Sequence, residues 1–123
     1  MNIKEKVYQA LMSSDELRAL LAKDRHRRCI YPGFSPNAES YPVLVYSVIS
    51  DVPAMTADGE EQERRVTMRI HIMTKDGRYD AIHRAVQKVM LRLGFMRAQT
   101  TEITEKDLFI LVIDYRIGIG VNE

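Results

Sequence analysis

Hydrophobic residues along this chain recur at helical spacing in two segments. The first pattern runs from Ile3 to Leu21 and is interrupted at residues 13–16, where Ser13 and Glu16 have capping-box spacing. This segment therefore predicts a helix, a break and a second short helix. The second pattern runs from Ile82 to Leu93 and predicts an amphipathic helix, with Gly94 well placed as its C-terminal cap.

Four other segments have strand patterns. Residues 66–72 alternate between apolar and polar side chains, which predicts a strand buried on one face. Residues 95–104 predict a mostly polar strand and residues 108–119 a strongly apolar one. The remaining strand, about residues 42–51, is apolar on both sides. One side carries Val43, Val45, Ser47 and Ile49, and the other side carries Leu44, Tyr46, Val48 and Val52.

Two connecting segments differ in stiffness. Prolines at 32, 36 and 42, with Gly33 for a left-handed turn, predict a stiff loop before the first strand. Between Pro53 and Glu63 the sequence is polar and acidic and contains an Asp-Gly pair. That composition predicts a long mobile hairpin loop at about residues 53–63.

The predicted order of elements is α-β-β-α-β-β, and we expect residues 1–123 to form a single domain of the α+β class. We expect one four-stranded antiparallel sheet with helices packed on one face. Two apolar sides on the first strand then indicate a partner chain, because the helices cover only one face of the sheet. The uncovered face is expected to mix apolar residues with Arg65, Arg69, His71, Asp114 and Arg116, a composition typical of an interface.

The charge balance argues against some classes of protein. The 123 residues include 18 basic and 17 acidic side chains, a net charge of +1, which disfavours a dedicated nucleic-acid binder or a polybasic membrane anchor. The N-terminal residues lack the apolar core of a signal peptide, so we expect synthesis in the cytosol. The longest apolar run, residues 109–113, is far too short to span a membrane.

The residues that carry chemistry do not form a recognisable site. The single Cys29 and the histidines at 26, 71 and 83 lack metal-binding spacing and are not placed as a nucleophile and base. The acidic run at 58–63 fits no calcium loop, and the glycines at 118 and 120 precede no helix that would bind a nucleotide. We therefore predict no catalytic residue, cofactor or metal, and favour an assembly or binding module.

Three segments carry a resemblance to a known family: Arg-Cys-Ile-Tyr-Pro-Gly at 28–33, Tyr-Pro-Val-Leu-Val-Tyr at 41–46 and the last strand at 111–117. With the surrounding elements, over about residues 3–119, the chain resembles the tail-completion or tail-terminator proteins of long-tailed bacteriophages and prophages. The resemblance implies a non-enzymatic ring, commonly a hexamer, on the head-proximal end of the tail tube. Such a ring stops tube growth and joins the tail to the head.

The resemblance also implies partners and a location. The partners are other copies of the chain, the tail tube protein, and a head-connector or adaptor protein, with DNA passing through the channel without specific binding. The protein is expected in the host bacterial cytoplasm during assembly and then in the virion tail. The residues expected at the subunit interface, on the open sheet face, are Tyr46, Arg69, His71 and Arg116.

The acidic loop is expected to dock on the tube or line the channel, where its negative charge would keep DNA from sticking. Its carboxylates are Asp58, Glu60, Glu61 and Glu63. The alternative is a small α+β nucleic-acid-binding module. It would use Arg65, Arg69 and Arg116 on the open sheet face, with Tyr46 stacking on a base.

Overall fold

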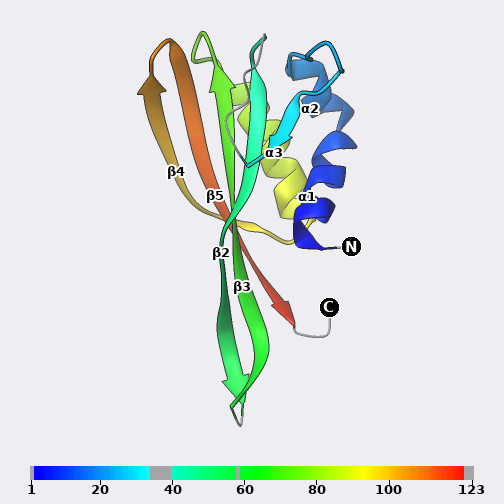
Figure 1. Cartoon of the computed structure of the whole chain (residues 1–123), viewed down its shortest axis with the longest axis vertical. Coiled ribbons are helices and arrows are strands. Elements are labelled where there is room, and N and C mark those ends of the chain that lie inside the picture. The colour runs from blue at the N-terminus through cyan, green and yellow to red at the C-terminus, as the bar shows by residue number, and fades with distance from the viewer. Residues whose placement is uncertain (1, 34–39, 58, 121–123) are drawn as a thin grey trace.

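The computed structural model describes residues 2–33, 40–57 and 59–120. It has two layers, a curved β-sheet and a set of helices that cover one of its faces (Figure 1). The elements in chain order are α1 (Ile3–Met12), α2 (Asp15–Leu20), β1 (Ile30–Pro32), β2 (Val43–Ala57), β3 (Glu60–Thr74), α3 (Asp80–Arg92), β4 (Met96–Glu105) and β5 (Leu108–Gly120). The α+β class and the helices on one face are as predicted. None of the helices in the described residues is long and apolar enough to cross a membrane.

The sheet is mixed and five-stranded, in the order β1-β2-β3-β5-β4, so the prediction of a four-stranded antiparallel sheet was wrong in detail. The additional strand is β1, which pairs parallel to the start of β2 and lies within the proline-bounded segment. The Gly33 N–H, at φ +78°, donates to the Tyr46 carbonyl at 2.8 Å. Three residues are too few to display an alternating pattern, which is why the sequence did not indicate this strand.

The helices follow the predicted pattern, with one change in their capping. The break between α1 and α2 is present, but the side chain that caps α2 belongs to Ser14, whose Oγ accepts the Leu17 N–H at 3.2 Å. Ser13 instead ends α1, and its Oγ donates to the Gln9 carbonyl at 2.7 Å. After α3 the chain turns at Gly94, at φ +100°, as predicted.

The main core lies between the helices and one face of the sheet. The largest side chains that it buries completely are Leu11 and Leu17 from the first two helices, Met90 from α3, Phe95, and Leu44, Met68, Ile70, Ile72, Ile113 and Tyr115 from the sheet. The alternation predicted for residues 66–72 is confirmed, because the even-numbered positions of β3 face this core.

The predicted loop at 53–63 is instead the end of a long β-hairpin. Residues 53–57 pair with residues 60–64, and only the turn separates the two strands. We call residues 50–57 and 60–65 the hairpin arm; it projects beyond the helices (Figure 1). Polar sequence misled the prediction because the arm's residues are mostly exposed, and backbone pairing between two strands requires no apolar alternation. Asp58 and Pro36 lie outside the described residues.

A β-bulge separates the body of β2 from the arm. The register between β2 and β3 shifts by one residue between Val48 and Ser50, which leaves Ile49 as the extra residue. Up to Val48 the two sides of the strand alternate as predicted. Beyond the bulge the alternation is reversed, and Val52 lies opposite Arg65, on the face away from the helices.

Candidate functional site

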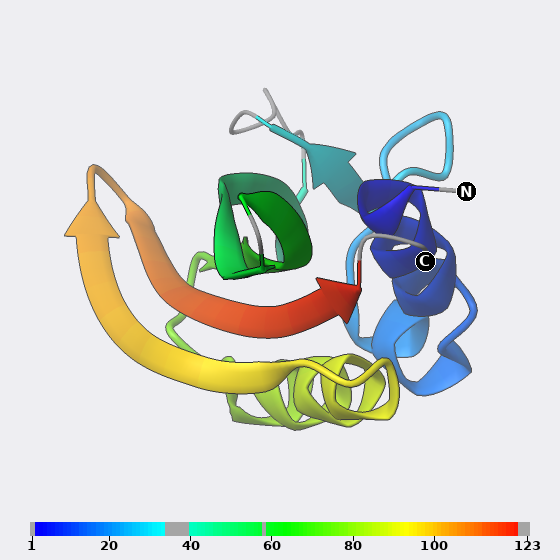
Figure 2. The same cartoon turned by 90° about the horizontal axis from the view of Figure 1, so that it is seen from below.

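The face of the sheet opposite the helices, here called the open face, is concave. Viewed from below, the β4–β5 pair curves around the β2–β3 pair (Figure 2). Inside this curve a second, smaller group of apolar side chains is buried, with exposed fractions of 1–8%. Its members are Tyr31, Val43, Val45, Met73, Ile110 and Val112, with Tyr41 and Leu108 packed against them. β2, the strand predicted at about residues 42–51, is therefore apolar on both sides, as predicted. The curvature of the sheet buries its second side.

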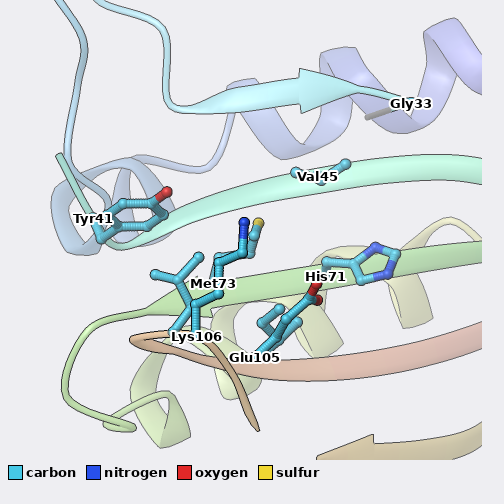
Figure 3. A pocket seen from close by; sticks show the side chains of 9 residues that line it. Gly33, Tyr41, Val45, His71, Met73, Glu105 and Lys106 are labelled. Atoms are coloured by element: carbon cyan, nitrogen blue, oxygen red, sulfur yellow. The ribbon is translucent and has the colours of Figure 1, made fainter. Parts of the chain in front are cut away.

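A cavity of about 480 Å³ lies beside this cluster (Figure 3). Its lining is Gly33, Tyr41, Val45, His71, Met73, Glu105, Lys106, Leu108 and Ile110. Most of these side chains are apolar or aromatic. The lining comes from the segments that flank β1 and β2 at Gly33 and Tyr41, from β2, β3 and β5, and from the end of β4 with the turn that follows it. Such a hollow is suited to the side chains of a partner protein.

His71 is the unusual polar residue in the cavity lining. Its Nδ1 atom is buried and has no hydrogen-bond partner in the described part of the chain. Burial lowers the pKa of the imidazole, and the Arg69 guanidinium lowers it further, while Asp114 acts in the opposite direction. The ring is therefore neutral at neutral pH. Because this nitrogen has no exposed surface, a buried water is better placed than a partner protein to satisfy it.

Arg69 and Asp114 form a bidentate ion pair on the open face. Arg69 Nε donates to Asp114 Oδ1 at 2.8 Å, and Arg69 Nη2 donates to Asp114 Oδ2 at 3.1 Å. Gln99 Nε2 also donates to Asp114 Oδ2, at 3.2 Å. The carboxylate raises the pKa of the guanidinium, and only 5% of Asp114 is exposed. Because its charge is already neutralised, Arg69 is poorly suited to bind phosphate.

Tyr46 does not lie where the interface prediction placed it. It faces the helices and is 6% exposed, with its ring centroid 5.7 Å from that of Tyr8 and the Lys4 Nζ 5.9 Å from its centre. The alternation along β2 could be predicted from the sequence, but the side that the helices cover could not. Arg69 and His71 do lie on the open face, and Arg116, opposite Thr67, lies exposed beside them. Without Tyr46 on that face, the nucleic-acid alternative loses its stacking residue.

The acidic side chains of the predicted loop lie on the hairpin arm. Glu60 and Glu61 are exposed next to the turn. Glu63 is partly buried and lies over Gly118, where an added Cβ would collide with its carboxylate. The arm therefore carries negative charge at its far end, as the sequence suggested, but on paired strands rather than on a loop.

The sequence did not indicate the two free edges of the sheet. β4 forms one edge, and all ten of its residues are exposed. In the part of the chain that the structure describes, β2 forms the other edge beyond Tyr46, where its pairing with β1 ends. Only the strand order defines these edges, although the polar composition of β4 was compatible with an edge position.

Chemically reactive groups are not gathered in the described residues. No group of three or more His, Cys, Asp or Glu side chains could hold a metal ion there. The Cys29 thiol is 1% exposed, and burial raises its pKa, which disfavours the reactive thiolate form.

A concave apolar face, two free sheet edges and a projecting arm are features of a protein that assembles with other chains. The sequence matches the family described as Tail completion protein gp17 over residues 5–120. The chain belongs to this family, which confirms the resemblance, and it is a structural protein of the phage tail.

Comparison with solved structures supports the fold. Seven solved chains match this protein. One comes from a structure titled "Virion of native gene transfer agent (GTA) particle", with a TM-score of 0.63 and 15% sequence identity over 93% of this chain and 91% of that chain. No curated protein is significantly similar in sequence.

Proposed function

We propose that copies of this chain form a ring, possibly of six, that caps the head-proximal end of the tail tube and joins the tail to the head. The observation that carries this proposal is the open face, where a cavity lies beside apolar side chains that no helix of the described residues covers. A closed ring would fill such a surface with a neighbouring copy and limit further growth. The interface is expected to include Arg69, His71 and Arg116.

The hairpin arm has a separate place in this proposal. It would reach the tail tube or line the channel, so that its Glu60, Glu61 and Glu63 carboxylates repel passing DNA. The tail tube protein and a head-connector or adaptor protein are then the partners on either side of the ring. Assembly would take place in the host bacterial cytoplasm, before the ring becomes part of the virion tail.

The ring is tested with purified protein and tail tubes, by light scattering and negative-stain microscopy. We expect a ring at one end of each tube, whether or not rings form in free solution. Tubes that bind no copies of the chain, combined with a strict monomer at high concentration, would overturn the proposal.

The arm is tested in phage assembly. Deleting residues 55–62 removes the end of a hairpin that projects from the body, so the fold should persist while head-to-tail joining is impaired. Joined virions at normal yield would contradict a role for the arm.

The charge of the arm is tested separately with E60K/E61K, which should allow joining but slow the exit of DNA. The matched control is E5K/E16K, which makes the same change in net charge at exposed positions of α1 and α2, away from the arm and the cavity. Equal DNA exit from both variants would contradict a role for the arm carboxylates.

A further inference from the structure

β4 is an edge strand with little protection against pairing. Edge strands are usually blunted by proline, lysine, bulges or a covering element. The sequence of β4, Met96–Glu105, contains neither proline nor lysine, and its protection is limited to the charged Arg97, Glu102 and Glu105 and one β-bulge, at Ala98. All ten residues are exposed, and Met96 is 73% exposed, the highest value among the large apolar side chains that the structure describes. This edge is therefore open to another strand.

The opposite edge of the sheet offers a strand in the correct direction. β4 is antiparallel to β5, β5 to β3, and β3 to β2, so β4 and β2 run in opposite directions. A second copy placed beside the first in the same orientation would bring β4 against the outer edge of β2 in an antiparallel arrangement. β1 covers that outer edge only as far as Tyr46, and no other strand of the described residues pairs with it from Ser47 onward.

We propose that β4 of one copy pairs with the distal half of β2 of the next copy, and that this pairing joins neighbours in the ring. One register places Met96 opposite Val52, an apolar side chain that is 45% exposed, and Arg97 opposite Asp51. The same register continues to Thr101 opposite Ser47.

The faces of the sheet agree with this register. Met96 lies opposite Arg116 within its own sheet and Val52 lies opposite Arg65, so both are on the open face. Arg97 lies opposite Tyr115 and is on the helix side, as is Asp51. Between the Arg97–Asp51 pair and the Thr101–Ser47 pair, each strand contains one bulge residue. This residue is Ala98 in β4 and Ile49 in β2, so the two bulges compensate for each other and the register is kept.

The charges also agree. Asp51 already accepts a hydrogen bond from Arg64 Nη1 at 3.3 Å, but its side chain is 43% exposed, which leaves room for a second guanidinium. The contact is head-to-tail, and such a contact closes into a ring when the rotation from one copy to the next is a whole fraction of a full turn. The inference rests on the proposed function and adds which strands meet.

Disulfide trapping tests the register. In the double variant S47C/T101C the two new thiols lie on opposite edges of one chain, so only different copies can link them. Under mild oxidation on tail tubes we expect a ladder of covalent multimers that ends at the ring size. S47C alone and T101C alone should stay monomeric, and V52C/T101C should not link because its cysteines are out of register. Cys29 is buried and stays in all variants.

Two results would overturn the inference. One is the absence of covalent multimers on tubes that carry rings by microscopy; the proposed function would then stand without this pairing. The other is a covalent dimer of the single variant T100C, because an antiparallel β4–β4 pair, with Gln99 opposite Thr101, would put Thr100 on its two-fold axis. Tubes without rings would instead contradict the proposed function itself.

A charge reversal provides a second test that requires no disulfide. R97E should weaken ring formation about tenfold, because it faces Asp51 with a like charge. D51K should also weaken it, and the double variant R97E/D51K should recover most of the loss. R84E, an exposed reversal on α3, is the matched control and should assemble normally. Thermal unfolding checks that each variant is folded, and failure of the double variant to recover would contradict the register.

Discussion

The two faces of the sheet are both apolar, yet they are buried in different ways. On the helix side Tyr115 is completely buried, and its hydroxyl donates to Gln87 Oε1 at 2.7 Å. On the open face Val43 and Ile110 are 1% and 6% exposed, but the curvature of the sheet shields them and a cavity of about 480 Å³ remains beside Ile110. Curvature can therefore hide apolar side chains in a single chain while leaving space for a partner.

The largest expected effect is on the free energy of unfolding, measured for the same truncation on each face of β5. Ile113→Ala, on the helix side, should lower the free energy of unfolding by about 4 kcal/mol, because a tightly packed core collapses little around the lost atoms. Ile110→Ala should cost about 2 kcal/mol, since its side chain already borders the cavity. Urea unfolding measures both. Equal losses would mean that the open face is packed as tightly as the core.

A smaller effect is expected at the ion pair of the open face. Arg69→Met leaves the Asp114 carboxylate with only the Gln99 amide, which should cost about 2 kcal/mol after allowance for the partial exposure of Arg69. The double variant R69M/D114N should regain part of this stability, because it also removes the buried charge. Urea unfolding of both variants measures the difference, and a single variant as stable as the wild type would show that solvent already screens the pair.

The smallest effect concerns His71 and pH. Burial holds the pKa of the folded imidazole below 6.5, the ordinary value, so below about pH 6.5 the unfolded chain binds a proton that the folded chain does not. The free energy of unfolding of the wild type should therefore fall as pH drops through this range, and that of H71N should fall less. His83, whose pKa is also lowered, contributes equally to both proteins. Parallel pH curves for the two proteins would show that the His71 nitrogen is not held neutral.

Most helices and strands of the body could be predicted from the local pattern of apolar and polar residues. The clean alternation of residues 66–72 and the helical spacing of residues 82–93 were sufficient, because each element buries one defined face. Tyr46 shows the limit of such reasoning: alternation along β2 separates it from Val45, but both sides of the strand are apolar. Which side meets the helices depends on contacts with distant residues such as Tyr8.

The candidate site was less predictable than the fold. The prediction placed Arg69 and His71 on the open face because they alternate with residues of the main core. The ion pair of Arg69 with Asp114 and the presence of the cavity depend instead on how β3 and β5 align. The free edges could not be predicted at all, since strand order is a property of the whole sheet. The strand ends at residues 53–57 were mistaken for a loop because neither side of the arm is covered.

The bulge at Ile49 makes the proposed contact between copies depend on the length of the chain. Val48 and Ser50 already pair with the consecutive residues Met68 and Thr67, so removing Ile49 would join them in a regular ladder. Val52 would stay opposite Arg65, and the arm would keep its two faces. The bulge of β4 at Ala98 would then have no counterpart on the neighbour, and Met96–Val52 and Thr101–Ser47 could not be in register together. A single-codon deletion would therefore leave the protein folded but weaken its contact with the next copy, and a deletion variant that formed normal rings would contradict this view.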